Sequence, residues 1–368
     1  MKKLTALFLA LALCLGLAAC GSAPENSTPD ASVPSDAPSS SQQEAPQQPE
    51  EPETPAFEGA DVNIAVLSGP TGIGAVGLME ANDAGETVNR YHFTVTAAND
   101  DVVAGLASGE FDIAAVATNV AANLYNKTSG GVQICALNTY GVLYILENGE
   151  RINSVQDLAG KTVFATGQGA NPEYVLEYIL SENGLNYYTP SSSSGEAPDP
   201  DSSVGIEFMD SETLVAGMAS GEYEICMLPV PAVTSVMMQN SDIRIALDLT
   251  QAWDNVTDEG VLTMGSIVVR TEFAQENPKA VKAFLEEYAA SIASVQSDVD
   301  HAAELCERYG IVAKAAVAAK AIPDCNLCCI TGADIQGAIE PYYNVLFNAN
   351  PNAIGGALPG EDFYFVAE

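Results

Sequence analysis

The residues of this sequence that could do chemistry are neutral hydrogen-bonding side chains in four short turns, at 68–72, 117–120, 166–171 and 228–231. Each turn follows an apolar run, and the first and third are rich in glycine and precede a predicted helix. Hydroxyl and amide groups, with backbone N–H groups before a helix, hold a small molecule by hydrogen bonds. For any single turn, the alternative is a glycine that serves only a tight bend. The candidate ligand-binding residues are Ser68, Gly69, Pro70, Thr71, Thr118, Asn119, Tyr140, Thr166, Gly167, Gln168, Asn171 and Pro229.

The sequence shows no catalytic constellation. Its two histidines, His92 and His301, lie in a predicted strand and on an acidic predicted helix, and no serine nucleophile motif occurs. Residues 69–74 match neither a dinucleotide-binding fingerprint nor a phosphate-binding loop with its lysine. We therefore expect a binding protein with no enzymatic activity, no cofactor and no resident metal ion.

The turns belong to a unit that occurs twice. The segment VAGLASGEFDI at 103–113 returns as VAGMASGEYEI at 215–225, and an apolar run with a following turn precedes each copy, at 62–71 and 162–171. Two copies are too few for a solenoid but suit two similar α/β lobes. Strands alternate with helices, which predicts mostly parallel sheets, and ligands bind at the carboxyl ends of such strands. The four turns are therefore predicted to line one shared cleft.

We predict an α/β fold of two similar lobes, with doubly wound, mostly parallel sheets joined by a two-crossover hinge. Residues 59–143 and 262–368 form lobe 1, and residues 144–261 form lobe 2. Trp253 lies beside the return crossover. Its ring either packs beneath the hinge or stacks on a ligand.

Residues 1–20 have the layout of a secretory signal, with Lys2 and Lys3 before an apolar stretch that is too short for a lasting membrane span. The segment that ends in Cys20 resembles the lipobox of bacterial lipoproteins, in which the cysteine carries the lipid. The alternative is a plain secretory signal with an incidental cysteine.

Residues 21–58 are predicted to be a disordered tether, because prolines, serines and glutamates dominate and neither Lys nor Arg occurs. The chain has a formal net charge of −36. A protein this acidic is a poor nucleic-acid binder and gains nothing from anionic lipid beyond its anchor.

The cysteines outside the leader leave alternatives open. Cys135 and Cys226 lie in apolar runs and are predicted to be buried core residues. The group at 325–329 has no second cysteine pair and no nearby histidine to complete a zinc site. A disulfide from Cys306 to this group and a set of free thiols are both compatible with the sequence.

Four segments carry a family resemblance: GPTG at 69–72, FDIAAVATN at 111–119, INSVQDLAGKTV at 152–163 and GSIVVRTEFAQENPKAVKAFL at 265–285. With the lipobox and tether, they resemble the substrate-binding lipoproteins of ABC importers, in the nitrate/taurine/sulfonate and thiamine-pyrimidine-binding group with its type II periplasmic-binding-protein fold. The resemblance implies capture of a small solute (sulfonate-, pyrimidine- or related-type) by hinge closure. The absence of Lys and Arg from the four turns favours a neutral or heteroaromatic ligand.

We therefore expect an extracytoplasmic solute-binding component of an ABC importer, a monomer held by lipid at Cys20 on the outer face of the cell membrane. It would deliver its solute to a permease with a cytoplasmic ATPase. One alternative is a sensory binding lipoprotein that signals to a membrane partner. Another is an extracytoplasmic enzyme on the same fold; related pyrimidine-synthesis proteins use a cofactor lysine, but Lys161 precedes a predicted strand rather than lying in a turn.

Overall fold

The computed structural model describes residues 59–366, apart from 98, 191–198, 200 and 258–259. The predicted signal, the predicted tether and Cys20, the predicted lipid-attachment site, lie outside the described residues. Most of the serine- and proline-rich stretch after Thr189 lies outside them too.

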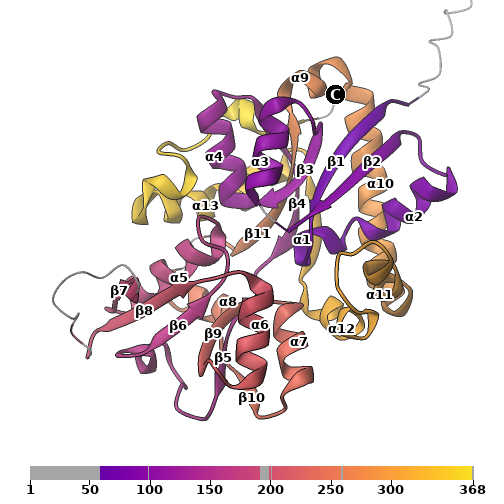
Figure 1. Cartoon of the computed structure of the whole chain (residues 1–368). Coiled ribbons are helices and arrows are strands. Elements are labelled where there is room, and N and C mark those ends of the chain that lie inside the picture. Colours follow the sequence, from indigo (N-terminus) through magenta and orange to yellow (C-terminus); the bar gives the residue numbers. More distant parts are fainter. Residues whose placement is uncertain (1–58, 98, 191–198, 200, 258–259, 367–368) are drawn as a thin grey trace, which may run out of the picture. The chain divides into compact units, whose positions relative to one another are not determined.

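Sheet A contains the early strands of the chain and two strands from its last third, in the order β12-β4-β11-β3-β1-β2. Strand β1 pairs in parallel with β2 and β3, whereas β11 runs antiparallel to both β3 and β4. In Figure 1, β11 is the orange strand that returns among the purple ones. The strands are β1 (Asp61–Leu67), β2 (Arg90–Thr96), β3 (Ile113–Ala117), β4 (Val132–Tyr140), β11 (Thr263–Arg270) and β12 (Leu327–Thr331).

Sheet B has the order β10-β5-β9-β6-β8-β7. Strand β6 pairs in parallel with β8 and β9, and β5 runs antiparallel to β9 and β10. The order β8-β6-β9-β5-β10 thus repeats β2-β1-β3-β11-β4 of sheet A, which confirms the predicted α/β fold of two similar lobes. The strands are β5 (Leu143–Asn148), β6 (Thr162–Ala165), β7 (Asn186–Tyr188), β8 (Ser203–Phe208), β9 (Ile225–Pro229) and β10 (Ile243–Asp248).

The chain passes between the sheets twice. It leaves β4 and enters β5 through Gly141 and Val142, and it returns from β10 to β11 through α8 (Leu249–Asp254). Both sheets fall within the compact unit Ala56–Glu368. Because β4 ends at the crossing where β5 begins, the carboxyl ends of the parallel strands of both sheets lie toward it.

Helices connect the strands of each sheet. No helix among the described residues is both long enough and apolar enough to cross a lipid bilayer. The helices other than α8 are α1 (Pro70–Ile73), α2 (Val76–Ala84), α3 (Asn99–Ser108), α4 (Thr118–Thr128), α5 (Asn171–Glu182), α6 (Ser211–Ser220), α7 (Ala232–Gln239), α9 (Thr271–Glu276), α10 (Pro278–Ser297), α11 (Val299–Arg308), α12 (Ala315–Ala321) and α13 (Asp334–Ala349).

The repeated sequence folds into the same helix–turn–strand in both sheets, α3–β3 and α6–β9. After each helix a glycine adopts a left-handed conformation, with φ of 78° at Gly109 and 82° at Gly221. Only glycine takes this conformation without steric cost. The next N–H donates back to a helix carbonyl, at 2.8 Å in the first copy and 2.9 Å in the second. The duplication inferred from sequence is therefore a duplication of local structure.

The short elements without a counterpart in the sequence prediction include β7, α8, α9 and β12. Strand β12 carries Cys328 and Cys329 and pairs irregularly with β4 at the edge of sheet A. The cysteines of the described residues are all free thiols, and Cys135 and Cys226 are buried as predicted. Within the described residues, no group of three His, Cys, Asp or Glu side chains is placed to hold a metal ion.

Candidate functional site

The structure brings three of the predicted turn residues into direct contact. Thr118 and Asn119 open α4 at the end of β3 in sheet A, and Asn171 opens α5 after β6 in sheet B. The Asn171 side-chain oxygen accepts the backbone N–H of Asn119 at 3.1 Å, and its nitrogen donates to Thr118 Oγ1 at 2.7 Å. All three residues are fully buried. The strand ends of the two sheets therefore meet through hydrogen bonds.

The Asn171 amide has further partners in sheet A and in α13. Its nitrogen faces the carbonyl oxygens of Met264 at 2.8 Å and Thr263 at 3.3 Å. The Tyr342 hydroxyl donates to its oxygen at 3.0 Å. The oxygen thus accepts two hydrogen bonds and the nitrogen faces three acceptors, which uses the full capacity of a carboxamide. The amide socket, as we call this set of partners, consists of Thr118, Asn119, Thr263, Met264 and Tyr342.

Two consecutive tyrosines of α13 hold the strand ends from one side. Tyr342 bonds to Asn171 beside sheet B, and Tyr343 donates to the backbone carbonyl of Thr118 in sheet A at 2.7 Å. Both rings are fully buried. Burial raises the pKa of each phenol well above its ordinary value, so both hydroxyls stay protonated and act as donors.

Two buried polar atoms at the socket have no hydrogen-bond partner among the described residues: Asn119 Oδ1 and Thr263 Oγ1. The Asn119 side-chain nitrogen is used, because it donates to the carbonyls of Gly169 at 3.3 Å and Ala353 at 3.2 Å. Buried polar atoms in proteins nearly always have a partner. The socket therefore offers more hydrogen bonding than the Asn171 amide uses.

The first predicted turn, 68–72, lies beside the socket but makes none of the hydrogen bonds just described. The Gly69 N–H already donates to the carbonyl of Ile311 at 3.0 Å, and Pro70 has no N–H to offer. Thr71 packs close to Gly265, where an added Cβ would lie 2.7 Å from the threonine methyl. Ser68 is exposed, and Gly69, Pro70 and Thr71 are half-buried. This turn can therefore offer a ligand its side chains, but few free backbone N–H groups.

The third predicted turn carries Asn171 at its end. Thr166 and Gly167 are half-buried, and Gln168 is exposed. The Gly169 N–H donates to the carboxylate of Glu173, which lies in the first turn of α5. A negative charge therefore already occupies the positive end of this helix, which disfavours a second anion there.

The remaining predicted residues, Tyr140 and Pro229, lie at the first crossing between the sheets. Tyr140 ends β4, pairs with Thr263 of β11 and is half-buried. Pro229 ends β9 opposite Leu143 of β5 and is half-buried as well. Neither makes a hydrogen bond to Asn171 among those of the described residues, and a cis peptide bond joins Val230 to Pro231 after Pro229.

Sequence reasoning missed several residues of the site. Asn138 bonds to the carbonyl of Thr71 at 3.0 Å, and Thr139 bonds to Asn138 at 3.2 Å. This polar pair near the end of an apolar run is the same signal that singled out Thr118 and Asn119, and it could have been found. Thr263 and the α13 tyrosines have no such local signal.

Trp253 packs as a core residue in this structure. It is fully buried, and its N–H donates to the carbonyl of Gly260 at 3.0 Å. Its ring lies 4.9 Å from that of Tyr178 in α5 and 5.4 Å from that of Tyr342. Of the two interpretations of Trp253, packing beneath the return crossover is the one this structure favours, and the indole supports Tyr342 of the socket.

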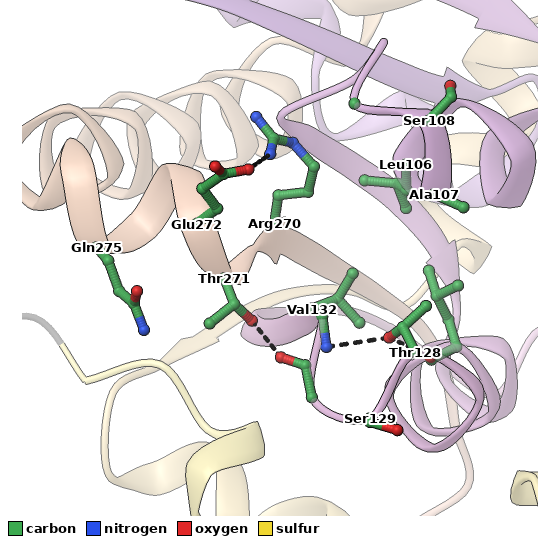
Figure 2. Close-up of a pocket in the computed structure, with 14 residues that line it drawn as sticks. Leu106, Ala107, Ser108, Thr128, Ser129, Val132, Arg270, Thr271, Glu272 and Gln275 are labelled. Atoms are coloured by element: carbon green, nitrogen blue, oxygen red, sulfur yellow. Dashed lines mark hydrogen bonds and ion pairs between the residues drawn. The ribbon is translucent and has the colours of Figure 1, made fainter.

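A hollow of about 500 Å³ in sheet A lies away from the socket. Its lining includes Arg270 at the end of β11, whereas Thr263 of the socket is at the start. The two residues are seven positions apart along the strand, which corresponds to roughly 23 Å. Figure 2 shows Arg270 directed toward Glu272, at 2.8 Å, and Arg270 also pairs with Asp112 at 3.0 Å. Its charge is thus already compensated, and the hollow is not the candidate site.

No protein-family model matches the sequence, and a search of curated proteins finds no match. Solved structures do match. The chain has 21% identity and a TM-score of 0.66 with an ABC transporter protein from Parabacteroides distasonis, over 83% of this chain and 99% of that one. For the periplasmic aliphatic sulphonate-binding protein SsuA of Escherichia coli the values are 15% and 0.61, over 83% and 96%.

The periplasmic nitrate-binding protein NrtA of Synechocystis PCC 6803 matches with 15% identity and a TM-score of 0.52, over 73% of this chain and 69% of that one. The chain therefore has the fold of the periplasmic binding proteins of ABC transporters. The resemblance seen in its sequence motifs is confirmed at the level of the fold.

Proposed function

We propose that this protein is the extracytoplasmic solute-binding component of an ABC importer, anchored by lipid at Cys20. The observation that carries the proposal is the meeting of the strand ends of two similar sheets at Thr118, Asn119 and Asn171. Ligands of α/β sheets bind at such strand ends. The fold neighbours support the proposal, since they are named as periplasmic binding proteins and ABC transporter components.

In this proposal the lobes are rigid bodies, one built on sheet A and one on sheet B. The two crossings form the hinge, at Gly141-Val142 and between β10 and β11. Opening would part Asn171 from Thr118 and Asn119, and closure would enclose a solute for delivery to a permease with a cytoplasmic ATPase. The proposed lining is Ser68, Gly69, Pro70, Thr71, Thr118, Asn119, Tyr140, Thr166, Gly167, Gln168, Asn171 and Pro229.

The charges around the socket favour a neutral solute. The partners of Asn171 are hydroxyl, backbone N–H and carbonyl groups, with no Lys or Arg among them. The Glu173 carboxylate caps α5 next to the socket. An anion would therefore find no cation and one nearby negative charge.

Thermal unfolding of the purified full chain against a solute panel tests the function. The panel contains pyrimidines, riboflavin, amino acids, taurine, alkylsulfonates and nitrate. A true ligand at a hundred times its Kd stabilises by about 2.7 kcal/mol, a shift of a few degrees for a protein of this size. Small-angle scattering with the same ligand should show compaction. A ligand that stabilises without compaction would contradict hinge closure, and a flat panel would count against solute capture.

Lipid attachment is tested separately. Metabolic labelling with a radioactive fatty acid should mark the wild-type protein and leave Cys20→Ser unlabelled. Release of the wild-type protein into the soluble fraction without label would contradict the anchor.

A further inference from the structure

Asn171 is held in the amide socket as a bound ligand would be held. Two donors, the Asn119 N–H and the Tyr342 hydroxyl, converge on its oxygen. Three acceptors surround its nitrogen: Thr118 Oγ1 and the carbonyls of Thr263 and Met264. Donors therefore lie on one side and acceptors on the other, at the spacing of a single –C(=O)–NH– group.

This pattern distinguishes an amide from an anion. A carboxylate, sulfonate or nitrate could place one oxygen on the Asn119 N–H and the Tyr342 hydroxyl. A second oxygen would then face the carbonyl oxygens of Thr263 and Met264, which repel it and leave both sides unsatisfied. A carboxamide, a lactam or an imide avoids this conflict, because its N–H and C=O lie side by side on one edge.

The unpartnered atoms are a second, independent sign of recognition. Asn119 Oδ1 and Thr263 Oγ1 have no partner while Asn171 fills the socket, and both residues are fully buried. One is an acceptor, and the other is a hydroxyl that can donate or accept. An occupant larger than a single carboxamide, with a further polar group beside its amide edge, could satisfy them both.

We propose that the amide socket recognises the –C(=O)–NH– edge of a neutral solute, and that Asn171 is a built-in occupant which the solute displaces. The proposal rests on the proposed function, because displacement requires the lobes to open. It names the chemical class of the ligand: carboxamides, lactams, imides and ureas. It excludes simple anions from this position.

Chemical rescue tests the socket without knowledge of the natural ligand. Asn171→Gly in the full chain removes the amide and leaves a space of acetamide size. We expect the variant to melt at a lower temperature than the wild type. Acetamide should raise its melting temperature by more than it raises that of the wild type, whereas acetate and N,N-dimethylacetamide should not. Equal effects of acetamide and N,N-dimethylacetamide would overturn the proposal.

Asn89→Gly is the matched control. Asn89 is 2% exposed, donates to the Tyr91 hydroxyl and the Ala280 carbonyl, and accepts the Ala60 N–H, before the start of β2. It is thus a buried asparagine away from the carboxyl ends of the strands, where the socket lies. Rescue of this variant to the same extent would make the effect generic and overturn the proposal. Should Asn171→Gly fail to fold, Asn171→Ser serves in its place with the same panel.

A second arm measures binding by calorimetry, with uracil, 1,3-dimethyluracil and taurine as probes. Uracil should bind the wild type, and 1,3-dimethyluracil, which lacks N–H groups, should not. If Asn171 fills the socket in about nine-tenths of the molecules, Asn171→Ala should bind uracil about tenfold more tightly. Binding of taurine but not uracil would overturn this proposal and leave solute capture standing. Binding of no solute in the wider panel would contradict solute capture, while the rescue arm still decides the socket.

Discussion

The two copies of the repeated unit fold alike but end differently. In both copies the helix, the glycine cap and the strand match bond for bond. Strand β3 is followed by Thr118 and Asn119, which belong to the amide socket. Strand β9 ends at Pro229 and is followed by Val230 and Pro231, none of which has a side-chain donor. The repeated residues therefore build the scaffold, and the residues just after each strand decide the chemistry.

The copies also differ in the burial of one equivalent ion pair. Asp112 in the first copy pairs with Arg270, with side chains 9% and 20% exposed. Glu224 in the second pairs with Arg151, with side chains 69% and 51% exposed. In each copy the backbone carbonyl of the acidic residue also accepts an N–H of the neighbouring antiparallel strand at 2.8 Å, from Arg270 of β11 in the first copy and from Asn148 of β5 in the second. The same position is thus a core contact in sheet A and a surface contact in sheet B.

The largest difference is expected between Asp112→Ala and Glu224→Ala. Asp112→Ala removes one partner of a nearly buried pair and also the acceptor of the Asn63 N–H, so it should destabilise by about 3 kcal/mol. Glu224→Ala breaks an exposed pair and should cost below about 1 kcal/mol. Urea unfolding of both variants makes the comparison. Equal losses would show that burial does not distinguish the copies.

Alanine at the two equivalent glycines should give the next largest difference. An added Cβ would lie 2.3 Å from the Phe111 ring at Gly105 and 2.2 Å from the Tyr223 ring at Gly217. Phe111 is buried, whereas Tyr223 is half-buried and can move outward. We expect losses of about 2 kcal/mol for Gly105→Ala and about 1 kcal/mol for Gly217→Ala. Phe111→Leu in the Gly105→Ala background should recover part of the loss; a further loss would contradict the clash.

The strand ends are compared through Thr118→Val and Pro229→Ala. Valine removes the hydroxyl that accepts from Asn171 and donates to the carbonyl of Thr263 at 2.7 Å. The loss should be about 1.5 kcal/mol, because buried partners lose their hydrogen bonds. Pro229→Ala should change stability by about 0.5 kcal/mol or less. Thermal unfolding measures both, and an equal effect would argue against a special role for the end of β3.

The last expected effect is a pH dependence from Glu177 of α5. Burial, and then the charge of Glu173, raise the pKa of Glu177 from 4.5 to about 7. A raised pKa means that stability is greatest below pH 4.5 and falls as the pH rises toward 7. Glu177→Gln should remove this slope, on the order of 1 kcal/mol. Urea unfolding at a series of pH values checks it, and an unchanged slope would assign the effect to other groups.

Glu147 in β5 provides the opposite sign as a control. Burial alone would raise its pKa, but the backbone N–H groups of Ile152 and Arg151 and the Arg244 guanidinium outweigh burial and lower it. Its contribution is therefore present above pH 4.5 and is lost as the pH falls through the lowered pKa. Glu147→Gln should therefore reduce the loss of stability at acid pH and leave the fall of stability toward pH 7 unchanged.

Local sequence signals predicted most of the scaffold. The apolar run with its following turn at 62–71 contains most of β1 (Asp61–Leu67), and Pro278 occupies the first position of α10 (Pro278–Ser297). Such elements follow from apolar runs, from proline at the first helical position and from glycine after a helix. Strand β12 was missed because it is short, lies at a sheet edge and pairs irregularly.

By itself, the sequence determined the duplicated unit, the elements of both sheets and the positions of the turns, because each depends on neighbours a few residues away. Only the tertiary structure decided that Asn171 is held by Thr118 and Asn119. It also decided that α13 places one tyrosine hydroxyl on the Asn171 side chain and the next one on the Thr118 carbonyl. These bonds join residues separated by 52 to 225 positions. Their formation depends on how two sheets and a distant helix come together, and no local pattern encodes that geometry.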